Sequence, residues 1–273
     1  MRKIVRKARN ESCNTIDFAL EIAEMENLMS NVYVVTGGTS GIGAAIVKRI
    51  LSSAKEDDKI FVNYGHNDAK ANSFFESLEK SEKEKVILVK ADLSDYGSME
   101  KFVETIGEKC QKVDHLICNT GIGTYMKFSE YTFDVWHHVM DTNISIPVFM
   151  IKKFMSLFSK DSSVLLVGSY AGRRPYSSSV VYSLSKAAVV FLAEVLVKEL
   201  EPLGARINAL APGFIETDWQ KDRTDESRDR VNKKIALHRF GLPEEVADMA
   251  YAVMTNKYMN GSVIDIHGGY DYF

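Results

Sequence analysis

The sequence predicts an α/β protein built on a doubly wound parallel sheet, and three observations carry that prediction. From residue 32 onward, short β-branched runs alternate with longer segments of helical period. Most of these runs are apolar almost throughout, which is the pattern of parallel strands covered on both faces. A glycine-rich turn joins the first run to the first helical segment. This alternation implies right-handed βαβ crossovers, with helices on both faces of the sheet.

Strands and helices alternate along a single domain. Seven strands are expected, at 32–36, 59–63, 85–91, 113–119, 163–169, 205–211 and 262–266. Helical patterns lie among them, at 42–53, 68–81, 96–109, 131–158, 180–202 and 243–255. No internal repeat or Pro/Gly-rich linker divides the chain, so residues 32–273 are expected to fold together. Ligands of such sheets bind beyond the carboxyl ends of the strands, near the point where the strand order reverses.

Composition excludes several classes of protein. The 34 basic and 37 acidic residues are interspersed and give a net charge of −3, so neither nucleic-acid binding nor a disordered acidic tail is expected. Cys13, Cys110 and Cys118 lack C-x-x-C spacing, which indicates no disulfide framework, no zinc site and a reducing compartment. No run of about 18 apolar residues is present, which predicts a soluble protein of the cytoplasm that binds no membrane.

Residues 1–31 form an N-terminal extension with no assigned catalytic role. Its first ten residues, "MRKIVRKARN", are strongly basic, but the acidic segment that follows argues against a transit peptide. Met25 or Met29 could equally be the biological start, because "MSNVYVVTGG" enters the first strand at once.

The glycine-rich turn predicts a nucleotide site. "TGGTSGIG" at 36–43 places Gly37, Gly41 and Gly43 between the first strand and the first helix. Glycines there permit a tight turn and let a pyrophosphate approach backbone N–H groups at the positive end of the helix. A strand-to-helix turn can use glycine for other reasons, but this context is the one that dinucleotide binding requires.

The end of the second strand bears on the choice of cofactor. A carboxylate there would bind a free adenosine ribose and disfavour a 2′-phosphate. The chain reads "FVNYGHND", with Asn63 and Tyr64 at the strand end and no carboxylate before Asp68. No Arg or Lys occupies the glycine loop or the strand end to bind a 2′-phosphate. NADP(H) is therefore favoured over NAD(H) only by the missing carboxylate. Asp92, at the end of the third strand, is a candidate for the adenine amino group or for the N-cap of the next helix.

A phenol and an ammonium share one face of an otherwise apolar helix. Tyr182 and Lys186 are spaced i and i+4 in "VYSLSKAAVVFLAEVLVKEL" at 181–200, so their side chains project from the same side. Taken alone, this pair is equally consistent with a solvated helix end.

Ordered motifs along residues 32–270 resemble the classical short-chain dehydrogenase/reductase family, and in particular members similar to 3-oxoacyl-acyl carrier protein reductases. They are "TGGTSGIG", "NTG" at 119–121, Asn143 in "DTNIS", Ser169 in "VGSYAG", "YSLSK" at 182–186, "PGFIET" at 212–217 and "HGG" at 267–269. The resemblance implies a Rossmann-like sheet of strand order 3-2-1-4-5-6-7. The chain departs from the family pattern at the glycine loop, which lacks a basic residue, at "NTG" in place of "NAG", and at His267, where Asp is frequent. The first departure bears on cofactor choice, and we expect the other two to be structural.

The resemblance also implies the catalytic residues of an NAD(P)(H)-dependent oxidoreductase that needs no metal. Tyr182 is then the general acid/base, and Lys186 lowers the Tyr182 pKa and holds the nicotinamide ribose. Ser169 orients the carbonyl or alcohol of the substrate, and Asn143 holds a backbone distortion and a proton-relay water. A free phenol has a pKa of about 10, so bringing it near neutrality takes roughly 3 to 4 kcal/mol from its surroundings.

Cofactor and substrate contacts follow from the same resemblance. The expected cofactor contacts are Gly37, Thr39, Ser40, Gly41, Ile42, Gly43, Asn63, Tyr64, Asp92, Leu93, Asn119, Gly121, Tyr182, Lys186, Pro212, Gly213, Ile215 and Thr217. The expected substrate contacts are Ser169, Tyr170, Tyr176 and Tyr182, in a pocket that also draws on Ile122, Tyr125, Arg173, Arg174, Phe214 and Trp219. The polar segment 217–230 lacks an apolar period and is interpreted as a substrate lid or a solvated loop.

Several functions remain open. A ketone or 3-oxoacyl thioester reductase leads, with a sugar, polyol or other secondary-alcohol dehydrogenase as the alternative. A non-catalytic dinucleotide sensor is disfavoured because Tyr182 and Lys186 are both present. An extended-branch epimerase or dehydratase is disfavoured because its T-G-x-x-G-x-x-G spacing is absent. Since helix 180–202 is more apolar than packing on one sheet face requires, a homodimer or homotetramer is expected.

Overall fold

The protein folds around one parallel sheet that lies between two layers of helices. The computed structural model describes residues 30–124, 126–175 and 179–272. All seven strands pair in parallel in the order β3-β2-β1-β4-β5-β6-β7, which confirms the predicted order. The strands are β1 (Val32–Val35), β2 (Lys59–Tyr64), β3 (Val86–Lys90), β4 (Val113–Cys118), β5 (Phe158–Val167), β6 (Arg206–Pro212) and β7 (Val263–Ile266).

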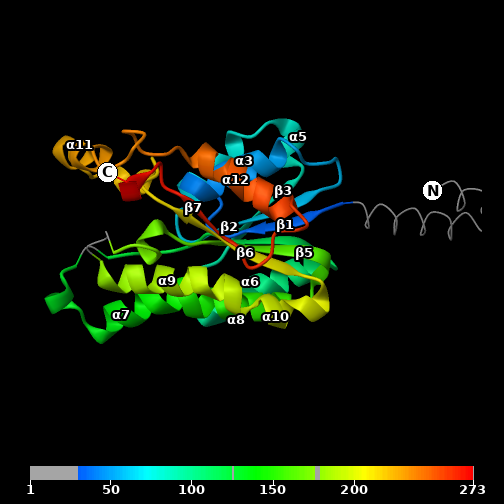
Figure 1. Cartoon of the computed structure of the whole chain (residues 1–273). Coiled ribbons are helices and arrows are strands. Elements are labelled where there is room, and N and C mark those ends of the chain that lie inside the picture. Colours follow the sequence, from blue (N-terminus) through cyan, green and yellow to red (C-terminus); the bar gives the residue numbers. More distant parts are fainter. Residues whose placement is uncertain (1–29, 125, 176–178, 273) are drawn as a thin grey trace, which may run out of the picture.

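The helices divide between the two faces of the sheet, as Figure 1 shows. One face is covered by α3 (Gly41–Leu51), α4 (Asp68–Glu76), α5 (Lys80–Lys83) and α12 (Pro243–Thr255). The other is covered by α6 (Tyr96–Lys109), α7 (Phe133–Met140), α8 (Ile146–Phe154), α9 (Val180–Val195) and α10 (Val197–Leu200). Each face buries its own apolar cluster, so alternate residues of the central strands face opposite layers.

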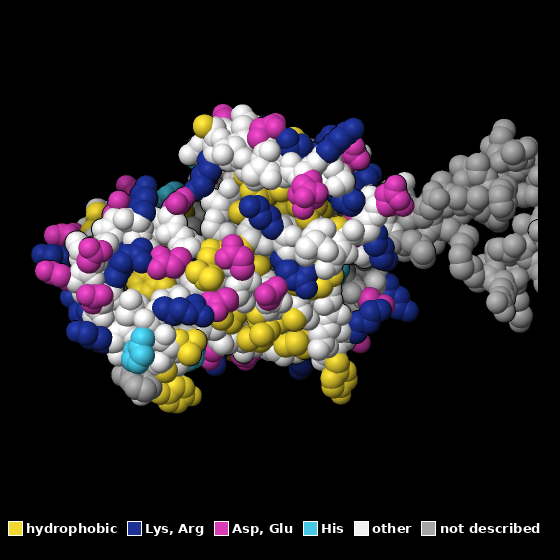
Figure 2. Space-filling view, turned by 90° about the horizontal axis from the view of Figure 1, so that it is seen from above, with side chains coloured by type: hydrophobic (Ala, Val, Ile, Leu, Met, Phe, Trp, Pro, Cys, Tyr) yellow, Lys and Arg dark blue, Asp and Glu magenta, His cyan; other side chains and the backbone are white. Residues whose placement is uncertain are grey.

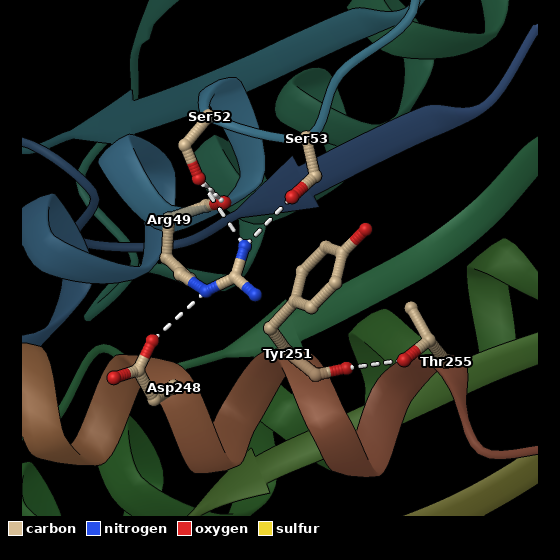
Figure 3. Close-up of polar contacts among 6 residues, drawn as sticks. All are labelled: Arg49, Ser52, Ser53, Asp248, Tyr251 and Thr255. Atoms are coloured by element: carbon tan, nitrogen blue, oxygen red, sulfur yellow. Dashed lines mark hydrogen bonds and ion pairs between the residues drawn. The ribbon is translucent and has the colours of Figure 1, made fainter.

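Polar contacts as well as apolar packing hold α12 against α3. Arg49, in the last turn of α3, donates to Asp248 at 2.9 Å, to Ser52 at 3.2 Å and to Ser53 at 2.8 Å (Figure 3). Its guanidinium lies 4.1 Å from the ring centroid of Tyr251. These contacts link two helices that lie about 200 positions apart in the chain. Figure 2 shows the outer surface of this layer, where basic and acidic side chains are interspersed.

Helix boundaries follow local capping. Asn67 accepts a hydrogen bond from Lys70 N at 2.9 Å at the start of α4, and Asp95 accepts one from Ser98 N at 2.7 Å at the start of α6. Asp92, for which an N-cap role was one alternative, does not cap α6. Such caps satisfy N–H groups that have no partner within the helix.

Three segments differ from the sequence prediction. The helical pattern 131–158 divides into α7, a π-helical turn at Asp141–Ser145 and α8, and β5 begins at Phe158 where the sequence indicated helix. Residues 159–162 are polar and carry no strand alternation, and the register shifts there, since three residues of β4 (113–115) lie opposite six of β5 (158–163). Pattern 180–202 breaks after α9, and pattern 68–81 breaks after α4.

The polar segment after β6 is helical rather than an irregular loop. It contains a 3₁₀ turn (Asp218–Gln220) and α11 (Asp225–Asn232). Thr224 caps α11 by accepting from Ser227 N at 3.3 Å, and buried Val231 anchors the helix to Ile235 and Phe240. In Figure 1, α11 lies at the end of the molecule opposite the start of β1, beside the C-terminal end of the chain.

Shorter 3₁₀ turns connect the remaining elements, at Phe128–Glu130, Tyr170–Gly172, Glu201–Leu203 and Tyr270–Tyr272. Among the described residues, no single helix has the length and apolar composition of a membrane span. A pair formed by α9 and Val197–Leu203 meets those criteria only when joined across a 46° bend.

Candidate active site

A cleft of about 630 Å³ opens beyond the carboxyl ends of the central strands. Residues that follow four neighbouring strands line it: Gly37 after β1, Asn119 after β4, Gly168 after β5 and Gly213 after β6. Its position beside β1 and β4, where the strand order reverses, is the place expected for a ligand of a doubly wound sheet. The cleft therefore brings together segments from most of the chain.

The glycine loop forms one wall of the cleft and fits a pyrophosphate. Gly37 and Gly41 have φ of 60° and 50°, which residues with a side chain rarely adopt. A Cβ on Gly43 would lie 2.2 Å from Gly37 O, so the loop and α3 pack backbone against backbone. Ser40 makes no side-chain cap and no acidic residue lies in the first turn of α3. The positive end of this helix therefore remains available to an anion.

Side chains behind the loop hold its shape. Asn119 donates to Thr36 O at 3.0 Å and to Gly37 O at 3.2 Å. Thr36 Oγ1 accepts from Asn119 N at 2.9 Å and from Thr120 N at 3.0 Å, which ties the end of β1 to the end of β4. Asn119 and the backbone of Thr120 thus hold the glycine loop in place.

Asn143 links the π-helical turn to the segment that follows β4, although its own side chain does not line the cleft. Its Oδ1 accepts from Ile122 N, and its Nδ2 donates to Ile122 O, both at 2.8 Å. The same Nδ2 lies 2.9 Å from Ser185 Oγ on α9. The predicted backbone distortion at Asn143 is present as the π turn. These contacts fix the residues after β4 relative to the helix that carries Lys186.

The Lys186 amine is buried at the centre of the site. Its Nζ donates to Val167 O at 2.9 Å, at the end of β5. Burial lowers the Lys186 pKa from 10.5 to about 8. Gly121 makes this position possible, since a Cβ there would lie 3.0 Å from Nζ and 3.3 Å from Asn143 Oδ1.

Tyr182 lies one turn before Lys186 on α9, and both side chains line the cleft. The Lys186 Nζ is 5.9 Å from the centroid of the Tyr182 ring. Ser169, which follows β5, lines the same cleft and accepts from Ala171 N at 3.1 Å. The i, i+4 pair is therefore not a solvated helix end, because it faces a cavity together with Ser169.

Comparison with known proteins shows to which family this chain belongs. The model of short chain dehydrogenases matches residues 31–228. The chain belongs to the short chain dehydrogenase family. It is an oxidoreductase of that family, which acts on CH–OH or C=O groups with NAD(P).

Relatives and solved structures extend the comparison along the chain. Glucose 1-dehydrogenase 2 of Bacillus subtilis is 30% identical over 251 residues, with 89% of this chain and 96% of the relative covered. The 3-oxoacyl-(acyl-carrier-protein) reductase of Chlamydia pneumoniae is 30% identical over 252 residues, with 90% and 98% covered. A blue fluorescent protein from a metagenomic library, crystallised with NADPH, is 25% identical, with a TM-score of 0.81 and coverage of 88% and 97%.

Most of the cofactor contacts expected of a short chain dehydrogenase line the cleft. Those that do are Gly37, Ser40, Gly41, Ile42, Asn119, Gly121, Tyr182, Lys186, Pro212, Gly213, Ile215 and Thr217. The segment after β6 reaches the glycine loop, because a Cβ on Gly41 would lie 3.2 Å from Thr217 Cγ2. Within the described parts of the chain, no group of three His, Cys, Asp or Glu residues is placed to hold a metal ion.

Six expected cofactor contacts lie outside the lining: Thr39, Gly43, Asn63, Tyr64, Asp92 and Leu93. The Asn63 amide is already bound, since it donates to Ala91 O at 3.0 Å and accepts from Gly37 N at 3.2 Å. It therefore supports the glycine loop from behind. Asp92 accepts from Ser94 N at 2.9 Å and lies 3.1 Å from His66 Nε2, and the Ser94 hydrogen bond chiefly lowers its pKa.

Four of the residues expected at the substrate pocket do not line the cleft. Tyr170 is buried, with its ring 4.1 Å from the His267 ring, so a substrate contact through Tyr170 has no support in this arrangement. Arg173 donates to Asp265 at 3.2 Å and does not line the cleft, and neither Ile122 nor Arg174 lines it. Phe214 and Trp219 do line it. The predictions for Tyr125 and Tyr176 concern positions outside the described residues.

The structure adds four cationic residues that sequence reasoning did not select. Lys70 on α4 lines the cleft and pairs with Asp218 across it. Arg223, Arg230 and Lys234 line the cleft around α11. None of them belongs to a recognisable motif, so only their placement in the fold identifies them.

Proposed function

We propose that the protein is an NADP(H)-dependent reductase of a ketone or 3-oxoacyl thioester that uses Tyr182 as its general acid/base. The observation that carries the proposal is the convergence of Tyr182, Lys186 and Ser169 on one cleft walled by a glycine loop. The similarity to a 3-oxoacyl-(acyl-carrier-protein) reductase supports the substrate class.

Each side chain has a distinct task in this proposal. The nicotinamide supplies or accepts the hydride when it is bound. The Tyr182 hydroxyl gives its proton to the carbonyl oxygen in reduction and takes it back in oxidation. Ser169 Oγ holds that oxygen in place. The Lys186 ammonium stabilises the Tyr182 phenolate, and its pKa of about 8 allows it to exchange protons near neutral pH.

Asn143 is a positioning residue in the same scheme. Its amide fixes Ile122 and approaches Ser185, so it determines where the backbone beside Lys186 lies. We propose that a water held there relays protons to Lys186.

Substitution of Tyr182 by Phe tests the catalytic proposal. We expect Tyr182→Phe to retain its dissociation constant for NADPH and to lose turnover of 3-oxoacyl thioesters by about 10²-fold or more. Tyr258→Phe, at a fully exposed tyrosine, is the matched control and should match the wild type. A Tyr182→Phe enzyme with a near-normal rate would remove this residue from the mechanism.

The charges at the adenosine end of the cleft support NADP(H) over NAD(H). Asp68, the first carboxylate after β2, is bound by Lys90, which chiefly lowers its pKa, and by Tyr64. Lys70, two residues further, faces the cleft and is the cation that the glycine loop lacks. The NADPH complex of the metagenomic protein supports the same choice. We propose that Lys70 leaves Asp218 to bind the 2′-phosphate.

The dissociation constants of NADPH and NADH decide this proposal. Lys70→Gln should weaken NADPH binding about tenfold while changing NADH binding little, because only NADPH carries the additional phosphate. Lys80→Gln on α5 removes the same charge away from the cleft and should change neither constant. Equal weakening of both cofactors would place Lys70 at the pyrophosphate, and tighter binding of NADH by the wild type would reverse the cofactor assignment.

A second candidate is a sugar, polyol or other secondary-alcohol dehydrogenase. The similarity to glucose 1-dehydrogenase 2 favours it. Oxidation of glucose or a polyol with NADP⁺ or NAD⁺, at a rate above that of 3-oxoacyl thioester reduction, would establish this alternative.

We also propose that the protein forms a homodimer or homotetramer. Large apolar side chains lie exposed on α7, α8 and α9 and beside them: Tyr96, Phe128, Phe133, Phe149, Val180, Leu184, Phe191 and Val195. Light scattering at micromolar concentration should give an oligomer for the wild type and for Tyr258→Glu. Phe191→Glu should shift the protein toward the monomer, and a monomeric wild type would contradict the proposal.

A further inference from the structure

The cleft is cationic although the whole chain is acidic. The net charge of the chain is −3. The described residues that line the cleft include five cations, Lys70, Lys186, Arg223, Arg230 and Lys234, and one carboxylate, Asp218. Lys70 and Lys186 belong to the proposed cofactor and catalytic sites. Of the other three cations, Arg230 lies on α11, and Arg223 and Lys234 lie just before and just after it. None of the three has a role in that scheme.

Two of these cations converge on one neutral oxygen. Arg223 donates to Ser227 Oγ at 2.8 Å, and Arg230 donates to the same oxygen at 3.4 Å. Arg223 also donates to Gln220 at 2.9 Å, and its guanidinium lies 5.2 Å from the Phe214 ring centroid. Neutral partners therefore hold the Arg223 guanidinium in a fixed place. Two guanidinium groups gathered on one hydroxyl repel each other unless an anion joins them.

These cations differ from the other arginines nearby in having no acidic partner. Arg228 pairs with Glu216 at 2.7 Å, and Arg239 pairs with Glu245 at 2.6 Å. Within the described residues, no carboxylate forms an ion pair with Arg223, Arg230 or Lys234, although α11 itself carries Asp225, Glu226 and Asp229. Lys234 follows Arg230 by four positions and lines the same cleft.

The cations are connected to the reacting end of the cleft. The Tyr182 ring lies 5.7 Å from the Trp219 ring, and Gln220, next in the chain, holds the Arg223 side chain. Phe214 contacts Arg223 and also lines the cleft. Trp219 and Phe214 thus form an apolar wall of the cleft that contacts Tyr182 through Trp219 and Arg223 through Phe214.

We propose that the physiological substrate carries an anionic group, a carboxylate or a phosphate, remote from its reacting carbonyl, and that Arg223, Arg230 and Lys234 bind this group. The inference rests on the proposed function and specifies its substrate. Arg223 is held in place by its neutral contacts, and the more exposed Arg230 and Lys234 complete the site around the anion. Guanidinium groups suit both anions, because each presents paired oxygens to their N–H donors.

Matched pairs of probes test the inference. One pair is a short 3-oxo acid and its methyl ester. The other is one 3-oxoacyl group carried as a thioester of phosphopantetheine and of pantetheine. Steady-state rates with NADPH give kcat and KM. Binding to the NADPH complex of Tyr182→Phe, followed by the fluorescence of the bound cofactor, gives affinities that do not depend on turnover.

The compared proteins are the wild type, Arg230→Gln/Lys234→Gln, and Lys233→Gln as a control at a neighbouring lysine outside the cleft lining. Arg223 is left intact because its packing on Phe214 supports the wall. We expect the wild type to have a KM about tenfold lower for the anionic member of at least one pair, and this preference should weaken as ionic strength rises. The double variant should lose the preference while retaining kcat and its KM for the neutral member.

Each outcome decides the inference. A preference for the acid identifies a carboxylate, and a preference for the phosphopantetheine thioester identifies a phosphate. If Tyr182-dependent reduction proceeds with equal KM for both members of each pair, the inference fails and the proposed function stands. If no probe is reduced, the proposed substrate class fails, and the affinities in the Tyr182→Phe background still show whether the anions bind at Arg230 and Lys234. Equal losses in the double variant and in Lys233→Gln would overturn the inference.

Discussion

The indole of Trp219 lies over the phenol of Tyr182, with ring centroids 5.7 Å apart and ring planes at 49°. Gly123 makes the contact possible, because a Cβ there would lie 3.1 Å from Trp219 and 3.2 Å from Tyr182. Asp218, the residue before Trp219, pairs with Lys70 across the cleft. The 3₁₀ turn that carries Trp219 is thus tied to both the cofactor side and the catalytic side.

This contact makes Trp219 a reporter of the site. The chain has two tryptophans, and the other, Trp136, lies on α7 outside the cleft lining. We expect NADPH to change the tryptophan fluorescence of the wild type and of Trp136→Phe, because the proposed binding of Lys70 to the cofactor would break its pair with Asp218, next to Trp219. Trp219→Phe should lose that change while binding NADPH within about twofold of the wild type. A full signal from Trp219→Phe would show that this turn does not respond to the cofactor.

Gly121 should matter for activity more than for stability. In Gly121→Ala the new methyl group would meet Lys186 Nζ at 3.0 Å, and the flexible end of that side chain can move aside. We expect kcat to fall about tenfold, with less than about 1 kcal/mol lost in the free energy of unfolding. Gly65→Ala, where nothing lies within 4 Å, is the control for adding a methyl group. Urea titration and steady-state kinetics separate the two effects, and unchanged kcat in Gly121→Ala would contradict the expectation.

Lys186 should make the cofactor-free protein more stable as pH rises from 8 to 10.5. Its pKa is about 8 in the folded state against 10.5 for a solvated lysine, so over this range the unfolded state binds more protons. The gain is up to about 3 kcal/mol, from about 1.4 kcal/mol per pKa unit. Lys186→Met should lack it. Cys118, whose pKa is raised by burial, contributes with the opposite sign but equally in both proteins. If the free energy of unfolding, measured by urea titration, changed equally with pH in the wild type and in Lys186→Met, this role of Lys186 would be refuted.

His115 should contribute to acid sensitivity far from the cleft. It lies on β4, stacked on Tyr33 with centroids 4.7 Å apart, and burial lowers its pKa from 6.5 to about 4. Because the unfolded state takes up the proton first, stability falls as pH drops from 6.5 to 4, by up to about 3 kcal/mol. His115→Phe keeps a stacked ring and should flatten the unfolding free energy over this range at unchanged activity. A slope equal to that of the wild type would show that other groups cause the acid sensitivity.

Sequence analysis predicted well those elements that leave a local pattern of apolar residues in the sequence. Continuous apolar runs identified six of the seven strands at their observed positions, since strands covered on both faces must be apolar along their length. The first half of β5 was missed because residues 159–162 are polar and give no strand signal, and the helical pattern 131–158 extended past the end of α8 at Phe154. α11 was missed because a capped, charged helix anchored mainly by Val231 has no apolar stripe to detect.

In the candidate site too, some features follow from local spacing in the sequence and others depend on tertiary packing. Tyr182 and Lys186 share a face because four positions make one helical turn, and Gly37, Gly41 and Gly43 share a loop because they are neighbours in the chain. The sequence alone therefore determined the glycine loop, the common face of Tyr182 and Lys186, and the sheet order that its family implies. Only the tertiary structure decided that Lys70 meets Asp218, that Arg223 and Arg230 converge on Ser227, and that Tyr170 turns toward His267. Long side chains reach partners that their spacing in the chain does not reveal, because those contacts depend on how separate strands and helices pack around the cleft.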